Sequence, residues 1–181
     1  MLIKDLIEAT FAKTVELWGE PVEGMAPKLW PPEPMGQGVP TMAPWVNRPY
    51  SPMLRERFEI CGRWTIAAHG HWLSTVDMEA LWSDEKTAAD PLLEGVREQQ
   101  VAGMENWANE ASSLFGPERL SLFAGSDYTY EKVYLLWVDY KPEPELWVYD
   151  ANGESRYRDL AAYLQAYLDD DVSAANNTWR A

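Results

Sequence analysis

The hydrophobic pattern of the chain is clearest in its last third, between residues 120 and 168. A run of β-branched, aromatic and aliphatic residues at 133–138 predicts a strand, and a second apolar run at 146–149 predicts another. The segment Asp-Ala-Asn-Gly at 150–153 then indicates a tight turn, because glycine readily adopts a positive φ. We therefore predict strands across 120–150.

A helix over 159–169 closes this unit. Asp159 is suited to cap its N-terminus, and large apolar residues follow at positions i, i+3, i+4, i+7 and i+8 of a helix that starts at Leu160. A helix with one apolar stripe packs on one face of a sheet.

Two earlier segments also have the period of an amphipathic helix. Residues 2–18 carry apolar side chains three and four positions apart, with charged residues between them. We expect this helix to dock on the core. The segment 90–115 starts with an Asp-Pro pair and is followed by a Gly-Pro pair, which are typical start and stop signals.

The rest of the chain divides into a proline-rich part and a strand-like part. Nine of the thirteen prolines lie in 21–52, together with Trp30 and Trp45. Proline lacks a backbone donor, so we predict an ordered, extended segment pinned across the domain by its aromatic residues. The alternative is an exposed aromatic and proline surface that meets a partner. Residues 57–76 read as strands around a His-Gly-His turn, and 78–82 read as a short helical turn.

Together these elements predict a single α+β domain over 1–181, with an antiparallel sheet packed against N-terminal, central and C-terminal helices. A length of 181 residues, 46% hydrophobic content and ten tryptophans fit one folded domain. No apolar run approaches the roughly 20 residues of a membrane span, and acids interrupt the N-terminal apolar stretch, which argues against a secretion signal. The single cysteine, Cys61, suits a reducing compartment, so we predict a cytoplasmic protein.

The charge balance limits the classes of partner that we expect. Twenty-nine acids against fifteen bases give a net charge of −14, and a nucleic-acid binder needs a basic surface that this chain lacks. We therefore expect neither a nucleic-acid nor a membrane partner. An acidic surface attracts basic partners, although many cytoplasmic proteins are acidic for solubility alone. Between Glu79 and Glu110 there are eight acids and two bases, so the outer face of the 90–115 helix should be strongly negative.

Catalytic motifs are scarce. His69 and His71 could present two imidazoles to Zn²⁺ from one strand face, but the glycine between them favours a turn in which the side chains diverge. Cys61 has no basic neighbour and no nucleophile elbow, which favours a buried, inert thiol. We predict no enzyme, no metal and no cofactor, and keep a metal-dependent hydrolase built on the two histidines as a weaker hypothesis.

The last third also resembles a known superfamily. The residues that carry the resemblance are LSLFAGSD at 120–127, the strand at 133–138, the strand ending at Tyr149-Asp150, and DLAAYL at 159–164. In this order they resemble the C-terminal part of SUKH (SMI1/KNR4) proteins. The proline-rich segment 21–52 has no counterpart in that pattern, and another immunity-protein family with a similar α+β ending stays open.

The resemblance implies an immunity protein of a bacterial polymorphic-toxin system, for example an effector–immunity pair of type VI secretion. Such a protein binds a cognate toxin or effector domain in the cytoplasm and blocks its active site or a nearby surface. Toxin nucleases are generally basic, so an acidic inhibitor can imitate the phosphate backbone and associate quickly.

We predict that the partner is contacted by acids of the 90–115 helix and by aromatic residues of the proline-rich segment, because tryptophans dominate binding hot spots. The candidates are Glu94, Glu98, Glu105, Trp30 and Trp45. The alternative function is a SUKH-like regulatory scaffold that binds cellular proteins or peptides without a toxin. The sequence leaves a homodimer open.

Overall fold

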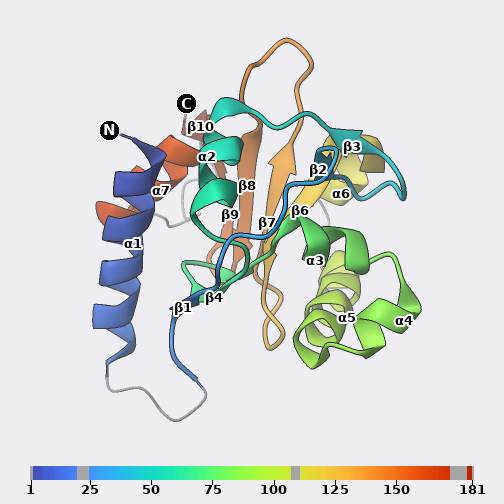
Figure 1. Ribbon diagram of the computed structural model, residues 1–181, viewed down its shortest axis with the longest axis horizontal. Coiled ribbons are helices and arrows are strands. Elements are labelled where there is room, and N and C mark those ends of the chain that lie inside the picture. The colour runs from blue at the N-terminus through green and yellow to red at the C-terminus, as the bar shows by residue number, and fades with distance from the viewer. Residues whose placement is uncertain (1, 20–24, 107–110, 172–178, 181) are drawn as a thin grey trace.

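Figure 1 shows the computed structural model, which describes residues 2–19, 25–106, 111–171 and 179–180. These residues form one central sheet, whose strands in spatial order are β1 (Lys28–Leu29), β4 (Trp64–Ala67), β5 (Gly70–Trp72), β6 (Leu120–Gly125), β7 (Lys132–Leu136), β8 (Glu145–Asp150), β9 (Gly153–Tyr157) and β10 (Trp179–Arg180). Neighbouring strands from β1 to β9 are antiparallel, and β10 lies parallel to β9. Two further strands, β2 (Val39–Pro40) and β3 (Asn47–Arg48), form a separate hairpin.

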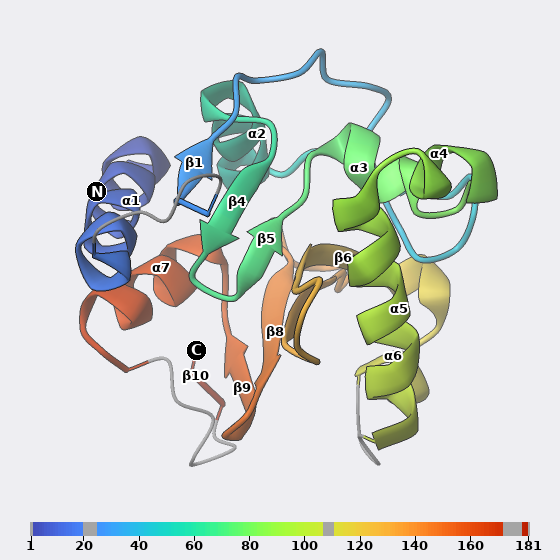
Figure 2. The same cartoon turned by 90° about the horizontal axis from the view of Figure 1, so that it is seen from below.

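Helices cover the sheet from two sides (Figure 2). Their bounds are α1 (Ile3–Trp18), α2 (Pro52–Ile60), α3 (Thr75–Ala80), α4 (Asp84–Ala88), α5 (Pro91–Asn106), α6 (Ala111–Leu114) and α7 (Leu160–Leu168), with a short 3-10 turn at Pro117–Arg119. The N-terminal and C-terminal helices α1 and α7 pack on each other and on α2, while α3 and α5 contact β6. The predicted α+β architecture is confirmed. None of the helices in the described ranges is long and apolar enough to cross a bilayer.

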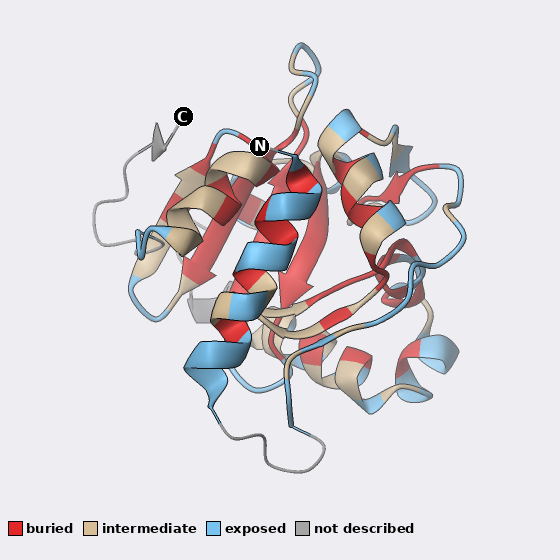
Figure 3. Ribbon diagram, turned by 60° about the vertical axis from the view of Figure 1, so that its left-hand side comes forward, coloured by how far each residue is buried: buried red, intermediate tan, exposed pale blue. Residues whose placement is uncertain are grey.

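The central strands are buried on both faces. Every residue of β6 and β7 is buried, and so is every residue of β8 except Asp150 (Figure 3). This double coverage explains why the sequence shows continuous apolar runs here instead of the alternation of a half-exposed sheet. The predicted strands across 120–150 are confirmed.

The C-terminal turn and helix follow the sequence signals. Asp150 pairs with Gly153 across a tight turn, and the positive φ of 118° falls on Gly153. The Asp159 carboxylate accepts the backbone N–H of Ala162 at 2.8 Å and so caps α7. The strand β9 lies between these two features, beyond the predicted strands at 120–150.

The N-terminal helix packs on the core as predicted, but its buried side changes from apolar residues to threonines along the helix. Ile3, Leu6 and Ile7 are buried, and one turn later Thr10 and Thr14 face the core in their place. The last turn of the predicted apolar stripe is half-exposed, because Trp18 points into a cleft described below.

The prediction of strands across 57–76 is wrong at both ends. Residues 57–60 belong to α2, because Ser51 accepts the N–H of Leu54 and Pro52 occupies the first helical turn. The helix buries Leu54, Arg57 and Phe58 on one side. At the other end β5 stops at Trp72 and Ser74 caps α3.

The predicted helix over 90–115 corresponds to α5 and α6. The Asp90 carboxylate accepts the N–H of Leu92 at 3.1 Å, which confirms the start. Residues 107–110 lie outside the described residues. The proline-rich segment is extended over its described part, 25–51, but only some of its aromatic residues pin it, since Tyr50 packs on the core and Trp45 does not.

Candidate partner-binding face

An acidic aromatic face is formed by the β2–β3 hairpin, the turn between α3 and α4, α4 itself and the outer side of α5, along one flank of the molecule (Figure 1). Three pockets hollow it, with volumes of about 550 Å³ at the hairpin, about 260 Å³ beside Trp82 and about 540 Å³ between α4 and α5. Adjacent pockets share lining residues, so the face is continuous. Its principal residues are Trp45, Val46, Trp82, Asp84, Glu94, Arg97, Glu98 and Val101.

Trp45 lies at the tip of the hairpin in a strained conformation. The N–H of Val46 donates to the carbonyl of Ala43 at 3.1 Å, so Pro44 and Trp45 are the two central residues of a tight turn. Trp45 has a φ of 69°, at a position where turns with positive φ normally carry glycine. An L-residue in this region costs about 1–2 kcal/mol. With 92% of its surface exposed, Trp45 gains almost no packing in return.

Hydrogen bonds from Thr41 and Trp82 hold the strained turn in place. Thr41 donates its N–H and its hydroxyl to the carbonyl of Val46, at 2.9 and 2.8 Å. The indole N–H of Trp82 donates to the carbonyl of Thr41 at 3.1 Å, which links the α3–α4 turn to the hairpin. Trp82 remains 42% exposed, so its ring is both fixed and available to a partner.

The acids of the face are concentrated at the pocket between α4 and α5. Glu94 and Glu98 are exposed on the first turns of α5 and line the pocket against α4. Asp84 on α4 forms an ion pair with Arg97 at 2.6 Å, with 90% of the Asp84 side chain exposed. The three pockets are lined by four acids and two bases, namely Glu79, Asp84, Glu94, Glu98, Lys86 and Arg97, so the face carries a net negative charge.

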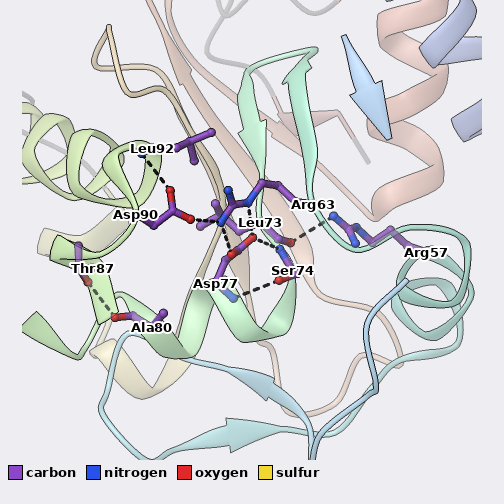
Figure 4. A network of polar contacts seen from close by, with 9 residues as sticks. All are labelled: Arg57, Arg63, Leu73, Ser74, Asp77, Ala80, Thr87, Asp90 and Leu92. Carbon is purple, nitrogen blue, oxygen red and sulfur yellow. Dashed lines mark hydrogen bonds and ion pairs between the residues drawn. The ribbon is translucent and has the colours of Figure 1, made fainter. Parts of the chain in front are cut away.

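A network of ion pairs and caps holds α3, α4 and α5 beneath this face (Figure 4). Arg63, just before β4, donates from Nε to Asp77 at 3.0 Å and from Nη2 to Asp90 at 2.6 Å. Partial burial opposes ionisation of Asp90, but the hydrogen bonds from Arg63 hold the pKa of Asp90 below its usual range. Asp77 also caps α3 with Ser74, so one arginine ties the starts of two helices to the sheet.

The structure places three of the five predicted contact residues together. Trp45, Glu94 and Glu98 belong to the acidic aromatic face. Trp30 lies elsewhere, in a cleft at the end of α1. The side chain of Glu105 lies outside the described residues.

Trp82, Asp84 and Val101 are parts of the face that sequence reasoning missed. A signal for them exists: Ser83 follows Trp82 and precedes two acids, which is the start pattern of a helix. The structure confirms that Ser83 caps α4, accepting the N–H of Lys86 at 3.3 Å. Reading that cap would have placed Trp82 at a surface turn.

The two histidines turn to separate partners. His69 is buried and contacts the hydroxyl of Tyr163 at 2.6 Å from Nδ1, while its Nε2 lies 3.4 Å from Asp150. His71 accepts the N–H of Ile66 at Nδ1, and its Nε2 lies 2.9 Å from Asp127. Within the described residues there is no cluster of three side chains suited to hold a metal ion.

Comparison with known proteins adds no identification. No protein-family model, no curated protein and no solved structure matches the chain.

Proposed function

We propose that this protein is a binding protein that docks a basic protein domain on the acidic aromatic face. We further propose that this domain is a cognate bacterial toxin or effector, with a nuclease as the expected class, and that the chain neutralises it as an immunity protein. This protein would bind over or beside the active site of the toxin domain, in the cytoplasm of the cell that makes both proteins.

The observation that carries the proposal is Trp45. A large aromatic residue that is almost fully exposed, in a backbone conformation that favours glycine, lowers the stability of the free protein. Tryptophan is the residue most enriched at energetic hot spots of interfaces, where a partner supplies the packing that the free protein lacks. The fixed ring of Trp82 beside it adds a second anchor.

The charge around the anchors supports a basic partner. Exposed Glu94 and Glu98 would steer a positively charged domain toward the face and speed its association, in the way that acidic inhibitors bind nucleases. The resemblance of residues 120–164 to SUKH proteins supports the same class of partner.

The proposal is tested by co-expression with any toxin-like domain that a neighbouring gene is found to encode. We expect the wild-type chain to protect the host, and expect Trp45→Ala with Trp82→Ala to lose protection while remaining folded. Each substitution should raise the dissociation constant about 30-fold, which corresponds to the loss of about 2 kcal/mol of binding free energy at a hot spot. Tyr140→Ala is the matched control, since it removes an exposed aromatic ring outside the face.

Two results would overturn the proposal. One is full protection by the double variant, which would place the interface elsewhere. The other is the lack of any protection by the wild type together with an association rate that does not change with salt, since steering between opposite charges weakens as ionic strength rises. That second result would favour a regulatory scaffold that binds peptides.

A further inference from the structure

A second concave site lies at the far end of the sheet from the β2–β3 hairpin, and we call it the aromatic cleft. It has a volume of about 790 Å³ and is bounded by the end of α1, by β1, by the β4–β5 turn and by the β6–β7 loop. These four segments gather at the lower end of the sheet in Figure 1. The residues used below are Trp18, Lys28, Trp30, Ile66, His71, Asp127 and Glu131.

Two half-exposed indoles form the walls of the aromatic cleft. Trp18 is 43% exposed, and its indole N–H donates to the carbonyl of Met25, which fixes the ring. Trp30 is similarly exposed and already binds a cation of the chain itself, since the ammonium nitrogen of Lys28 lies 3.6 Å from its ring centroid. Lys28 therefore covers one face of Trp30, and the rest of the two indole rings offers apolar surface to an alkyl chain.

Two carboxylates line the same cleft from the β6–β7 loop. The loop is ordered by Ser126, whose hydroxyl oxygen accepts the N–H groups of Tyr128 and Thr129 at 3.0 and 2.9 Å. It is also packed tightly on α5, because a Cβ added at Gly95 would lie 2.8 Å from the Cβ of Asp127. The two carboxylates, Asp127 and Glu131, are thus held in place before any ligand binds.

Glu131 has no cation to balance it. It is half-buried, and no lysine or arginine of the described residues forms an ion pair with it. Burial raises the pKa of Glu131. A positively charged group in the cleft would satisfy this carboxylate.

The β4–β5 turn forms another wall of the aromatic cleft, and its backbone is strained. Ile66 has a φ of 55°, which is unusual for a β-branched residue, and its N–H donates to Nδ1 of His71 at 3.1 Å. Since Nδ1 accepts this hydrogen bond, the neutral ring carries its proton on Nε2 and donates a hydrogen bond from it to Asp127 at 2.9 Å. The strained turn thus holds His71 against Asp127.

We propose that the aromatic cleft binds a primary alkylammonium group, with the ammonium hydrogen-bonded to Glu131 and Asp127 and the alkyl chain against Trp18 and Trp30. A primary ammonium carries three N–H donors, which suit carboxylate acceptors better than a quaternary ammonium does. The same chemistry occurs in a free aliphatic amine and in a lysine side chain of a protein. The site is separate from the acidic aromatic face and does not depend on it.

The first experiment compares four probes that each carry a four-carbon chain, by NMR, following the indole N–H signals of Trp18 and Trp30. We expect n-butylammonium to shift both signals in a saturable way, and n-butanol and butyrate to leave them unchanged. N-butyl-trimethylammonium should bind several-fold more weakly than n-butylammonium. Equal binding of butanol, or tighter binding of the quaternary cation, would overturn the proposal.

Substitutions locate the ammonium. Glu131→Gln should weaken n-butylammonium binding at least tenfold, and Asp127→Asn should weaken it less, because His71 already uses one of its oxygens. Glu59→Gln, which changes an exposed carboxylate of α2 outside both sites, is the matched control and should have no effect. Unchanged binding by both Glu131→Gln and Asp127→Asn, with unchanged melting temperatures, would contradict the assignment.

A final comparison distinguishes a protein lysine from a free amine as the source of the ammonium group. N-acetyl-lysine methylamide carries the lysine side chain in a peptide setting. Binding tighter than that of n-butylammonium assigns the cleft to a protein lysine, and weaker binding assigns it to a free amine. No binding of either compound overturns the proposal.

Discussion

The tryptophans of the sheet and those of the acidic aromatic face are used in opposite ways. Trp64, Trp72 and Trp147 are almost fully buried, and their indole N–H groups find no acceptor in the described part of the chain. They contribute volume and apolar contact. Trp45 and Trp82 keep large exposed areas, and Trp82 uses its N–H to fix its ring. The sheet therefore stabilises the fold, while the face presents aromatic surface at a cost to stability.

This contrast implies that stability and partner binding can be altered separately. A change in the sheet should unfold the protein without altering the face of the molecules that remain folded. A change at the face should alter binding with little loss of stability. The following predictions test this separation, from the largest effect to the smallest.

Phe123→Ala should have the largest effect. The ring is fully buried in β6, with its centroid 4.7 Å from that of Trp72, so the substitution leaves a cavity in the centre of the core. We expect the free energy of unfolding to fall by about 3–5 kcal/mol, measured by urea denaturation. A loss below about 1 kcal/mol would show that the core collapses around the cavity and that the sheet is less rigid than described.

Arg63→Ala should act on the connection between the two regions. It leaves the nearly buried Asp77 without its cation and releases Asp90, and we expect a loss of about 2–3 kcal/mol. Hydrogen exchange should rise in α3 and α5 before it rises in β6 to β8. Arg63→Lys, which keeps the charge but not the two-pronged geometry, should lose less. Uniform exchange across the molecule would contradict the role of this network in holding the helices.

Trp45→Gly should raise stability, by up to about 1 kcal/mol, because glycine adopts a positive φ without strain. Trp45→Ala is the matched control: it removes the same ring but keeps a Cβ, so it should bring no such gain. Thermal melts of the two variants give the comparison. Equal stability of the glycine and alanine variants would mean that the turn is not strained.

Asp90→Asn should change the acid dependence of stability, with the smallest effect of the four. The pKa of Asp90 is lowered in the folded state from a usual value of 3.8. The ionised group therefore stabilises the protein above that value, and this contribution is lost as the pH falls through the lower folded-state pKa. In the variant, urea midpoints should fall less steeply between neutral pH and pH 3. An identical profile would exclude Asp90 from the acid response.

Much of the fold could be predicted from local signals. Asp159 capped α7, and the long apolar runs marked β7 and β8, because these features depend on neighbours in sequence. The strand β9 lies beyond the predicted strands at 120–150, since Glu154, Ser155 and Arg156 have no apolar pattern, and it forms by pairing with β8. Residues 57–60 were predicted as strand because a short apolar segment fits either element, and the Ser51-Pro52 start of α2 was overlooked.

The candidate site was only partly predictable for the same reason. Trp45 and the acids of α5 stood out by composition, but nothing in the sequence shows that the hairpin and α4 lie side by side. Trp30 was grouped with Trp45 because both occur in the proline-rich segment, and the structure separates them. The strain at Trp45 and Ile66 is a property of the folded backbone and leaves no trace in residue type.

The most direct test of the separation is the dissociation constant of Trp45→Gly for the partner domain, measured by surface plasmon resonance on a variant of known stability. We predict binding weaker by about 30-fold, although the variant is at least as stable as the wild type. An unchanged dissociation constant would contradict the assignment of the acidic aromatic face as the binding surface.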